Sequence, residues 1–279
     1  MTTWFIGAAG NRIAASTFGP ATGKPVLMLG GMGQTRHSWS RAAQAIGAQG
    51  RCAITLDLRG HGESDWAPDG DYGFAQMAGD LVAVASSLDQ PSVLVGASLG
   101  GKVALAAAGH GDAHVAGLVM VDTAPMVEPG GIAEVTRFLN APAEGFSSPQ
   151  AAAEELARQN GRTVAPDAAA KMQRNMRQDR AGGWHWHWDP AIRDRKHGVR
   201  GASANGYLAD AAARLTIPVL LTRGERSPVV SDASIAHFRG LTPQLQVETI
   251  PGAGHMIVGD QNDDFAAAVL RFLELNPGL

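Results

Sequence analysis

Disulfide bonds and membrane-spanning runs are both missing from this sequence. Cys52 is the only cysteine among 279 residues, so no disulfide can form within the chain, which is compatible with a reducing cytoplasm. No run of about 18 or more apolar residues suggests a membrane span. The first residues, MTTWFIGAAGNRIAAS, lack the basic region and the long apolar region of a signal peptide. We therefore expect a cytoplasmic protein that does not enter a membrane.

An excess of one charge sign is also lacking. The 23 Lys and Arg residues nearly balance the 26 Asp and Glu residues, for a formal net charge of −3 at pH 7. No block of like charges marks a basic or acidic tail. We therefore expect neither nucleic acid nor an anionic membrane as a partner. Hydrophobic residues make up 45% of the chain, which is enough for a globular protein with a sizeable core.

Short apolar runs alternate with helical patterns over most of the chain. Helices are expected at 74–88, 102–108 and 264–275, among others, and a hairpin is expected before residue 25. This alternation predicts an α/β fold, in which a mainly parallel, twisted sheet carries helices on both faces. The expected parallel strands lie at residues 25–29, 52–56, 92–95, 114–121, 218–222 and 246–250.

The alternation stops between residues 125 and 205. Helical patterns at 132–139, 149–159 and 166–178 are separated by Pro and Gly, without a β-branched run of strand length. We therefore expect a helical cap over residues 125–205, inserted into a core that residues 1–124 and 206–279 form together.

One serine lies among three glycines, between a predicted strand and a predicted helix. In the stretch GASLGG, Gly96, Gly100 and Gly101 lack the Cβ atoms that would clash in a very sharp turn. Ser98 would then be exposed beside N–H groups of a helix N-terminus, which suit a developing oxyanion. A serine hydroxyl is a poor nucleophile unless a positioned base takes its proton. The hypothesis of a nucleophilic serine therefore requires a histidine elsewhere in the chain.

Four segments, in the right order, resemble the α/β-hydrolase fold family. The stretch GASLGG is similar to that family's nucleophile elbow, G-x-S-x-G. The stretch LGGMG at 29–33 resembles its oxyanion loop, and LDLRGHGES at 56–64 resembles the segment after its fourth strand. The stretch GAGH at 252–255 resembles the loop that carries its catalytic histidine. The resemblance covers nearly all of the chain outside the predicted cap and implies the fold and a serine nucleophile.

The resemblance also implies a role for each matching residue. Ser98 would be the nucleophile and His255 the general base. The backbone N–H groups of Leu99 and Met32 would form the oxyanion hole. Gly30 departs from the family pattern, which usually has a histidine at this position. The departure removes a side-chain hydrogen-bonding group beside the loop but no backbone donor.

The acid of the triad does not lie at the family's usual position. After the strand at 218–222, Ser227 occupies that position, and a serine cannot carry the charge that stabilises a forming imidazolium. Asp122 directly follows the strand at 114–121, at the sheet edge where ligand-binding residues meet. Some branches of the family, including haloalkane dehalogenases, resemble this arrangement. Asp122 is therefore the predicted acid, and Glu225 is the alternative.

Candidate substrate contacts follow from chain position. The stretch WHWHW at 184–188 either forms an aromatic wall for the substrate or anchors the cap, and the second interpretation is preferred. Its two histidines, without nearby carboxylates, do not make a metal site, and neither a metal nor a cofactor is expected. The candidate contacts lie beside the oxyanion loop, beside His255 or in the cap: Gly31, His37, Met126, Phe138, Trp184, Trp186 and Met256.

These features predict a serine hydrolase that acts on a small-molecule substrate. It would cleave a small or medium ester, lactone or thioester through an acyl-enzyme on Ser98. Two other functions stay open. A cofactor-independent oxygenase or C–C bond-cleaving enzyme would use His255 and Asp122 as a base, and a receptor would bind its ligand without turnover.

Overall fold

The expected strands form one sheet in the computed structural model, which describes residues 2–110, 114–135, 145–159, 161, 163–173, 175–193, 204–260 and 262–279. Within these residues the sheet has eight strands in the order β1-β2-β4-β3-β5-β6-β9-β10. β1 and β2, and β2 and β4, pair antiparallel, and the other neighbours pair parallel. The predicted α/β fold is therefore confirmed. The strands span Thr3–Ile6 (β1), Arg12–Phe18 (β2), Pro25–Leu29 (β3), Cys52–Leu56 (β4), Ser92–Ala97 (β5), Val115–Val121 (β6), Val219–Gly224 (β9) and Leu245–Ile250 (β10).

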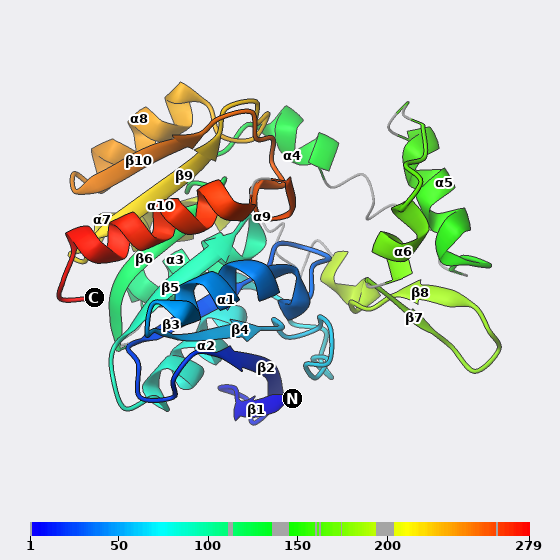
Figure 1. The fold of residues 1–279 in the computed structure, drawn as a ribbon, viewed down its shortest axis with the longest axis horizontal. Coiled ribbons are helices and arrows are strands. Elements are labelled where there is room, and N and C mark those ends of the chain that lie inside the picture. The colour runs from blue at the N-terminus through cyan, green and yellow to red at the C-terminus, as the bar shows by residue number, and fades with distance from the viewer. Residues whose placement is uncertain are drawn as a thin grey trace.

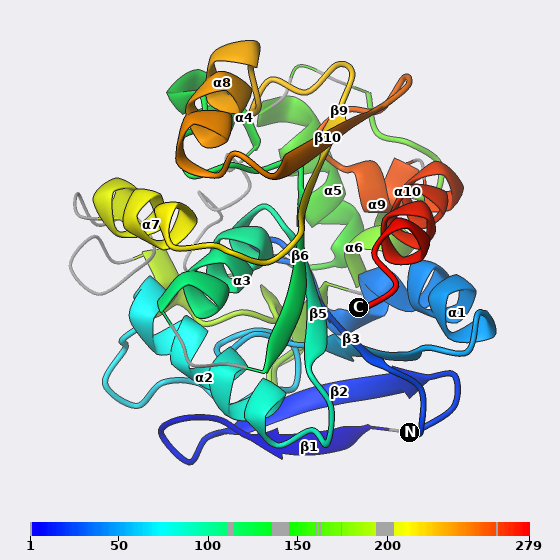
Figure 2. The same ribbon diagram turned by 90° about the vertical axis from the view of Figure 1, so that its left-hand side faces the viewer.

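Helices cover both faces of this sheet because its parallel strands are apolar on both sides. Side chains in a strand point alternately to opposite faces. In β3, Leu27 and Leu29 belong to one buried apolar cluster, while Val26 and Met28 belong to the other. Figure 2 shows α2 and α3 on one face with α7, and α1 on the other face with α10. The helices span Ser40–Ala48 (α1), Phe74–Ser86 (α2), Leu99–His110 (α3), Ala204–Ala213 (α7), Asp232–Leu241 (α8), Ile257–Asp260 (α9) and Asn262–Leu275 (α10).

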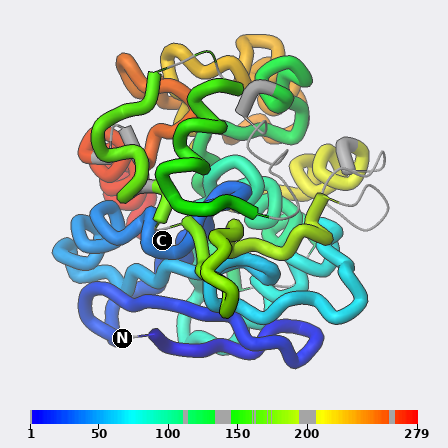
Figure 3. The backbone as a smooth tube through the Cα atoms, turned by 90° about the vertical axis from the view of Figure 1, so that its right-hand side faces the viewer, coloured from blue at the N-terminus to red at the C-terminus, as the bar shows by residue number. Residues whose placement is uncertain are grey.

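The segment between β6 and α7 lies to one side of the sheet (Figures 1 and 3). It contains α4 (Pro129–Val135), α5 (Pro149–Gln159) and α6 (Ala168–Gln173). It differs from the sequence expectation where a helix was predicted over 166–178. That helix ends at Gln173, and β7 (Met176–Gln178) pairs antiparallel with β8 (Trp184–Trp186). The period-two order Trp-His-Trp fits a strand, and the Asp179 carboxylate closes the hairpin by accepting from the Gly183 N–H, 2.9 Å away.

Residues just after β8 fasten this segment to the core. The hydroxyl of Tyr72 donates to the carboxylate of Asp189, whose own backbone N–H donates to the carbonyl of Gly60, 2.8 Å away. Trp188 and Ile192 are buried in the main apolar cluster. Ile192 belongs to a short 3-10 helix (Pro190–Arg193). These contacts join the segment to the loop that follows β4.

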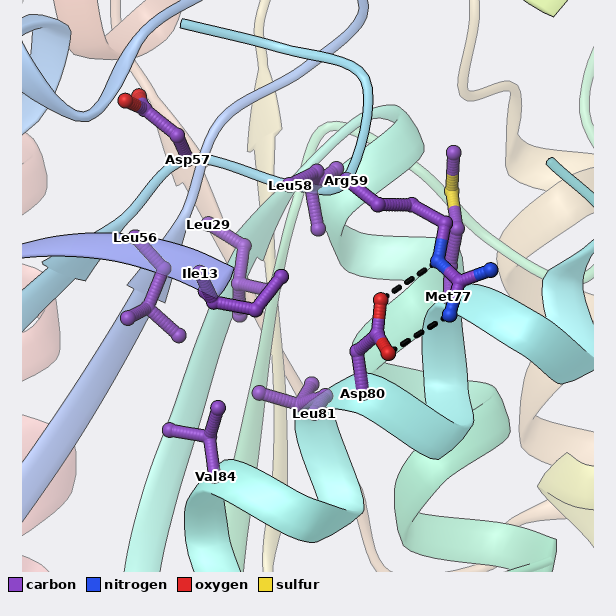
Figure 4. Close-up of a pocket in the computed structure, with 10 residues that line it drawn as sticks. All are labelled: Ile13, Leu29, Leu56, Asp57, Leu58, Arg59, Met77, Asp80, Leu81 and Val84. Atoms are coloured by element: carbon purple, nitrogen blue, oxygen red, sulfur yellow. Dashed lines mark hydrogen bonds and ion pairs between the residues drawn. The ribbon is translucent and has the colours of Figure 1, made fainter. Parts of the chain in front are cut away.

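A buried ion pair holds the segment after β4 against α2. The guanidinium of Arg59 donates two hydrogen bonds, of 2.6 and 2.7 Å, to the carboxylate of Asp80 (Figure 4). Both side chains are almost fully buried, and Asp80 also accepts from the Ala8 N–H and the Asn11 side chain. The small pocket beside the pair is lined mainly by apolar core side chains and by none of the predicted catalytic residues. We therefore interpret this pocket as a packing gap.

We predict that Asp80→Ala destabilises the fold by about 3–5 kcal/mol, because it leaves the Arg59 charge buried without its partner. Asp263→Ala, which breaks the exposed pair of Asp263 with Arg41, is the matched control and should change stability by less than about 1 kcal/mol. Urea denaturation of both variants measures the difference. Equal losses in the two variants would contradict the structural role of the buried pair.

Candidate active site

Ser98 lies at a sharp turn between β5 and α3 that only small neighbours permit. Its φ of +48° is in the left-handed region, which residues other than glycine rarely adopt. A Cβ at Gly96 would lie 2.3 Å from the carbonyl oxygen of Gly100. One at Gly100 would lie 2.5 Å from the carbonyl oxygen of Leu29, and one at Gly101 would also meet a neighbour at 2.5 Å. The three glycines of the motif are therefore required by the turn.

The turn brings Ser98 into one pocket with His255. His255 lies in the loop between β10 and α9, and its side chain is 9% exposed. In the part of the chain that the structure describes, the hydroxyl and the imidazole are not hydrogen-bonded; such bonds are often long before substrate binds. The pocket is lined by Gly31, Met32, Gln34, Ala97, Ser98, Val121, His255, Met256, Ile257 and Val258.

Behind His255 lies the fully buried carboxylate of Asp122. Asp122 follows β6 with a φ of +48°, and its Oδ1 accepts from the Gly224 N–H at 2.9 Å. Its Oδ2 accepts from Nδ1 of His255 at 2.7 Å and from the hydroxyl of Ser227. Because Nδ1 carries the proton in this bond, Nε2 is the ring nitrogen that can accept one. Ser227, at the family's usual acid position, is thus a hydrogen-bond donor to Asp122.

The alternative acid, Glu225, faces a different group. Its side chain is exposed, and Oε2 accepts from the Gly252 N–H at 2.7 Å. Glu225 therefore accepts from the turn that precedes His255, and no hydrogen bond joins it to the imidazole ring among the described residues. Of the two carboxylates that the sequence proposed, Asp122 is the one hydrogen-bonded to His255.

The loop after β3 is closed by a side chain of its own. The Gln34 N–H donates to the Gly31 carbonyl at 3.1 Å, and the Gly31 N–H donates to Oε1 of Gln34 at 2.8 Å. The Gly31 N–H is therefore occupied. Within the described residues, the N–H groups of Met32 and Leu99 have no acceptor, and Leu99 is the first residue of α3. These are the two donors expected for the oxyanion hole.

The structure brings two of the seven candidate substrate contacts, Gly31 and Met256, to this pocket. His37 and Met126 are exposed elsewhere, and Phe138 lies outside the described residues. Trp184 and Trp186 belong to β8, where Trp186 packs edge-on against Phe146. Five further residues of the pocket were not among the residues predicted from the sequence. Of these, only Gln34 had a signal in the sequence, because it directly follows the predicted oxyanion loop at 29–33. The missed residues are Gln34, Ala97, Val121, Ile257 and Val258.

The sequence profile of the alpha/beta hydrolase fold family matches residues 24–261, which contain the sheet from β3 onward and the whole pocket. The chain belongs to the alpha/beta hydrolase fold family. The resemblance inferred from the four motifs is thereby confirmed.

Relatives of this alpha/beta hydrolase are enzymes that cleave bonds by hydrolysis. N-formylmaleamate deformylase of Pseudomonas putida is 31% identical over 253 residues, which are 90% of this chain and 89% of that protein. The sn-1-specific diacylglycerol lipase of the mouse is 29% identical over 262 residues, 91% and 82% of the two chains. The solved structure of an esterase from Mycobacterium tuberculosis matches with a TM-score of 0.77 at 27% identity, covering 98% and 92%. The protein is therefore a hydrolase.

Neither a metal site nor a membrane-spanning helix is found in the described part of this alpha/beta hydrolase. No group of three or more His, Cys, Asp or Glu side chains there could hold a metal ion. None of the helices described is long and apolar enough to cross a membrane.

A buried histidine in the segment after β4 makes the stability of the fold depend on pH. His61 is fully buried, and burial lowers the pKa of its imidazole to about 3, with His187 nearby adding to the effect. The unfolded chain binds a proton at this residue near pH 6.5, and the folded chain does not. The free energy of unfolding must therefore decrease as the pH falls below about 6.5.

We predict that this decrease is about 1.4 kcal/mol between pH 7.5 and pH 5.5 for His61 alone. Urea denaturation at the two pH values, on the parent protein and on His61→Asn, measures it. The variant should lose less stability than the parent by that amount. The same loss in both proteins would show that His61 is protonated equally in the folded and unfolded chains.

Proposed function

We propose that the protein is a serine hydrolase that cleaves a small or medium ester, lactone or thioester through an acyl-enzyme on Ser98. The observation that carries this proposal is the hydrogen bond between buried Asp122 and Nδ1 of His255, in a pocket that also contains Ser98. A fixed tautomer with a free Nε2 is what a general base for a serine hydroxyl requires.

The proposed reaction has two halves. Nε2 of His255 takes the proton of Ser98 while Oγ attacks the substrate carbonyl carbon, and the negative oxygen receives hydrogen bonds from the N–H groups of Met32 and Leu99. His255 then gives the proton to the leaving group, and the acyl-enzyme forms. In the second half, His255 takes a proton from water, which attacks the acyl carbon. His255 then returns the proton to Oγ of Ser98 as the bond to the acyl carbon breaks, which releases the acid and restores the free serine. Asp122 stays ionised throughout and stabilises the imidazolium.

The position of the acid is supported by its surroundings. β6 and β9 are neighbours, with Val121 opposite Thr222, so a carboxylate at the end of β6 lies one strand away from the usual position. The hydroxyl of Ser227, which replaces the usual carboxylate, donates to Asp122. The carboxylate therefore lies one strand away from the family's usual position and still accepts a hydrogen bond from His255.

The substrate class is proposed from the pocket wall and the relatives. Apolar side chains of Met32, Val121, Ile257 and Val258 make up much of the wall, which suits an uncharged acyl group. The relatives named above include a lipase and an esterase, and both names point to ester substrates. We further propose that residues 125–205 form a cap that limits access to this pocket, with residues 1–124 and 206–279 as the core.

The first test is the release of p-nitrophenol from short-chain p-nitrophenyl esters by the parent and by Ser98→Ala. We predict turnover by the parent only, and mass spectrometry of a rapidly quenched reaction should find the acyl group on the peptide that contains Ser98. Equal release by both proteins would contradict the proposed nucleophile. Consumption of a substrate only in the presence of oxygen would instead favour the oxygenase alternative.

The second test concerns the acid. Asp122→Asn should keep the fold but lower kcat by about 10⁴-fold, because the neutral amide no longer holds His255 in the required tautomer. Glu225→Gln is the matched control, since it also exchanges a carboxylate for an amide and keeps an acceptor for the Gly252 N–H. Its kcat should stay within about threefold of the parent. A large loss in Glu225→Gln with a small one in Asp122→Asn would overturn the assignment.

A further inference from the structure

His187 belongs to the Trp-His stretch that the proposed mechanism does not use. It lies just after β8, far in sequence from the catalytic loops, and is 6% exposed. Its Nδ1 accepts from the Gly62 N–H at 2.7 Å, and its Nε2 donates to the Gly33 carbonyl at 3.1 Å. One imidazole therefore joins the loop after β4 to the loop after β3.

The loop that receives this bond carries a proposed oxyanion donor, Met32. Three of its residues, Gly30, Gly31 and Gly33, are glycines, so the loop has few side chains with which to fix itself, and Gly33 has a φ of +75°. The family's histidine is absent at Gly30. The side chain of Gln34 accepts from the Gly31 N–H, and the Arg36 N–H, three residues beyond Gly33, donates to Asp57. Between these two contacts, the Gly33 carbonyl accepts from His187.

The other end of the bridge is rigid. Gly62 packs so closely on Asp57 that a Cβ there would lie 2.2 Å from its carboxylate. That carboxylate is buried and accepts from the backbone N–H groups of Glu63, at 3.0 Å, and of Arg36, at 2.6 Å. The Arg36 guanidinium, itself buried, also pairs with Asp57. His187 therefore connects the glycine-rich loop to a part of the core that buried hydrogen bonds and an ion pair hold in place.

We infer that His187 is a positioning residue for the proposed reaction: by holding the Gly33 carbonyl it keeps the Met32 N–H aimed at the developing oxyanion. This inference rests on the proposed function. Preorganised donors stabilise a transition state most when they need not move as charge develops, and small displacements of such groups slow reactions strongly. His187 acts through the loop and does not touch the reacting atoms.

The bridge requires a neutral imidazole, because Nδ1 must accept from Gly62. Burial lowers the pKa of His187, and the charge of Arg177 acts in the same direction, while the hydrogen bond to the Gly33 carbonyl and the carboxylate of Asp57 oppose the shift. The ring of His61 also lies close, with its centroid 6.0 Å from that of His187. At neutral pH the ring can thus donate through Nε2 and accept through Nδ1 at once.

Two conservative variants separate the two bonds of the bridge. In His187→Asn the amide takes the place of Nδ1 and can still accept from Gly62, but it is too short to reach Gly33. In His187→Gln the longer amide reaches the position of Nε2 and can donate to Gly33. The matched control is His185→Asn, on β8 itself, because His185 is partly exposed and pairs with Asp179 across the hairpin turn.

The experiment measures kcat and KM on a p-nitrophenyl ester, the rate of covalent labelling of Ser98 by a fluorophosphonate, and the melting temperature of each protein. We expect His187→Asn to lower kcat and the labelling rate by about 10- to 100-fold with KM within about threefold. His187→Gln should recover most of this loss, and His185→Asn should match the parent. Backbone amide exchange in residues 30–34, which needs no substrate, should become faster in His187→Asn only.

The outcomes distinguish the inference from the proposed function. A parent protein that neither turns over the ester nor is labelled at Ser98 would contradict the proposed function. In that case the amide-exchange comparison would still test whether His187 restrains residues 30–34. Unchanged kcat, labelling and exchange in His187→Asn would overturn the inference. So would a loss that His187→Gln does not recover at an unchanged melting temperature, or an effect confined to KM.

Discussion

The buried carboxylate of Asp122 is the constraint on which the arrangement of the pocket depends. A carboxylate with no exposure is tolerated only if it is fully hydrogen-bonded, and Asp122 receives bonds from Gly224, Ser227 and His255. Its donors come from the end of β9, the loop after it and the loop after β10, so three parts of the chain must meet at one point. The neighbouring strand, β5, ends at Ala97, directly before Ser98. The order β5-β6-β9-β10 therefore brings the proposed nucleophile, acid and base together along one sheet edge.

The segment after β4 carries a family motif whose side chains the proposed mechanism does not use. Its Asp57 fixes the loop after β3 through Arg36, Arg59 joins it to α2 through Asp80, and Gly62 receives the contact from His187. These contacts form a hydrogen-bonded support beside the glycine-rich loop that carries a proposed oxyanion donor. Because an oxyanion hole works by preorganisation, we expect the support of that loop to matter as much as its own residues.

The sequence was sufficient to predict the site where the backbone geometry requires a particular residue type. The glycines around Ser98 are required by the turn, and Asp122, which is hydrogen-bonded to His255, was predicted from its place directly after a parallel strand. The sequence was insufficient where the structure depends on packing between segments that lie far apart in the chain. The hairpin β7–β8 has strands of three residues, too short for a periodic signal, and the place of Gln34 in the pocket wall depends on how its loop closes.

The most direct test of the account is nitrogen NMR of the imidazole of His255, which reports the ring nitrogen that carries the proton. The account predicts a proton on Nδ1 in the parent protein and in Glu225→Gln, and its transfer to Nε2 in Asp122→Asn, where an amide can donate to the ring. A parent protein with the proton on Nε2, or a switch caused by Glu225→Gln and not by Asp122→Asn, would contradict the claim that Asp122 orients the base.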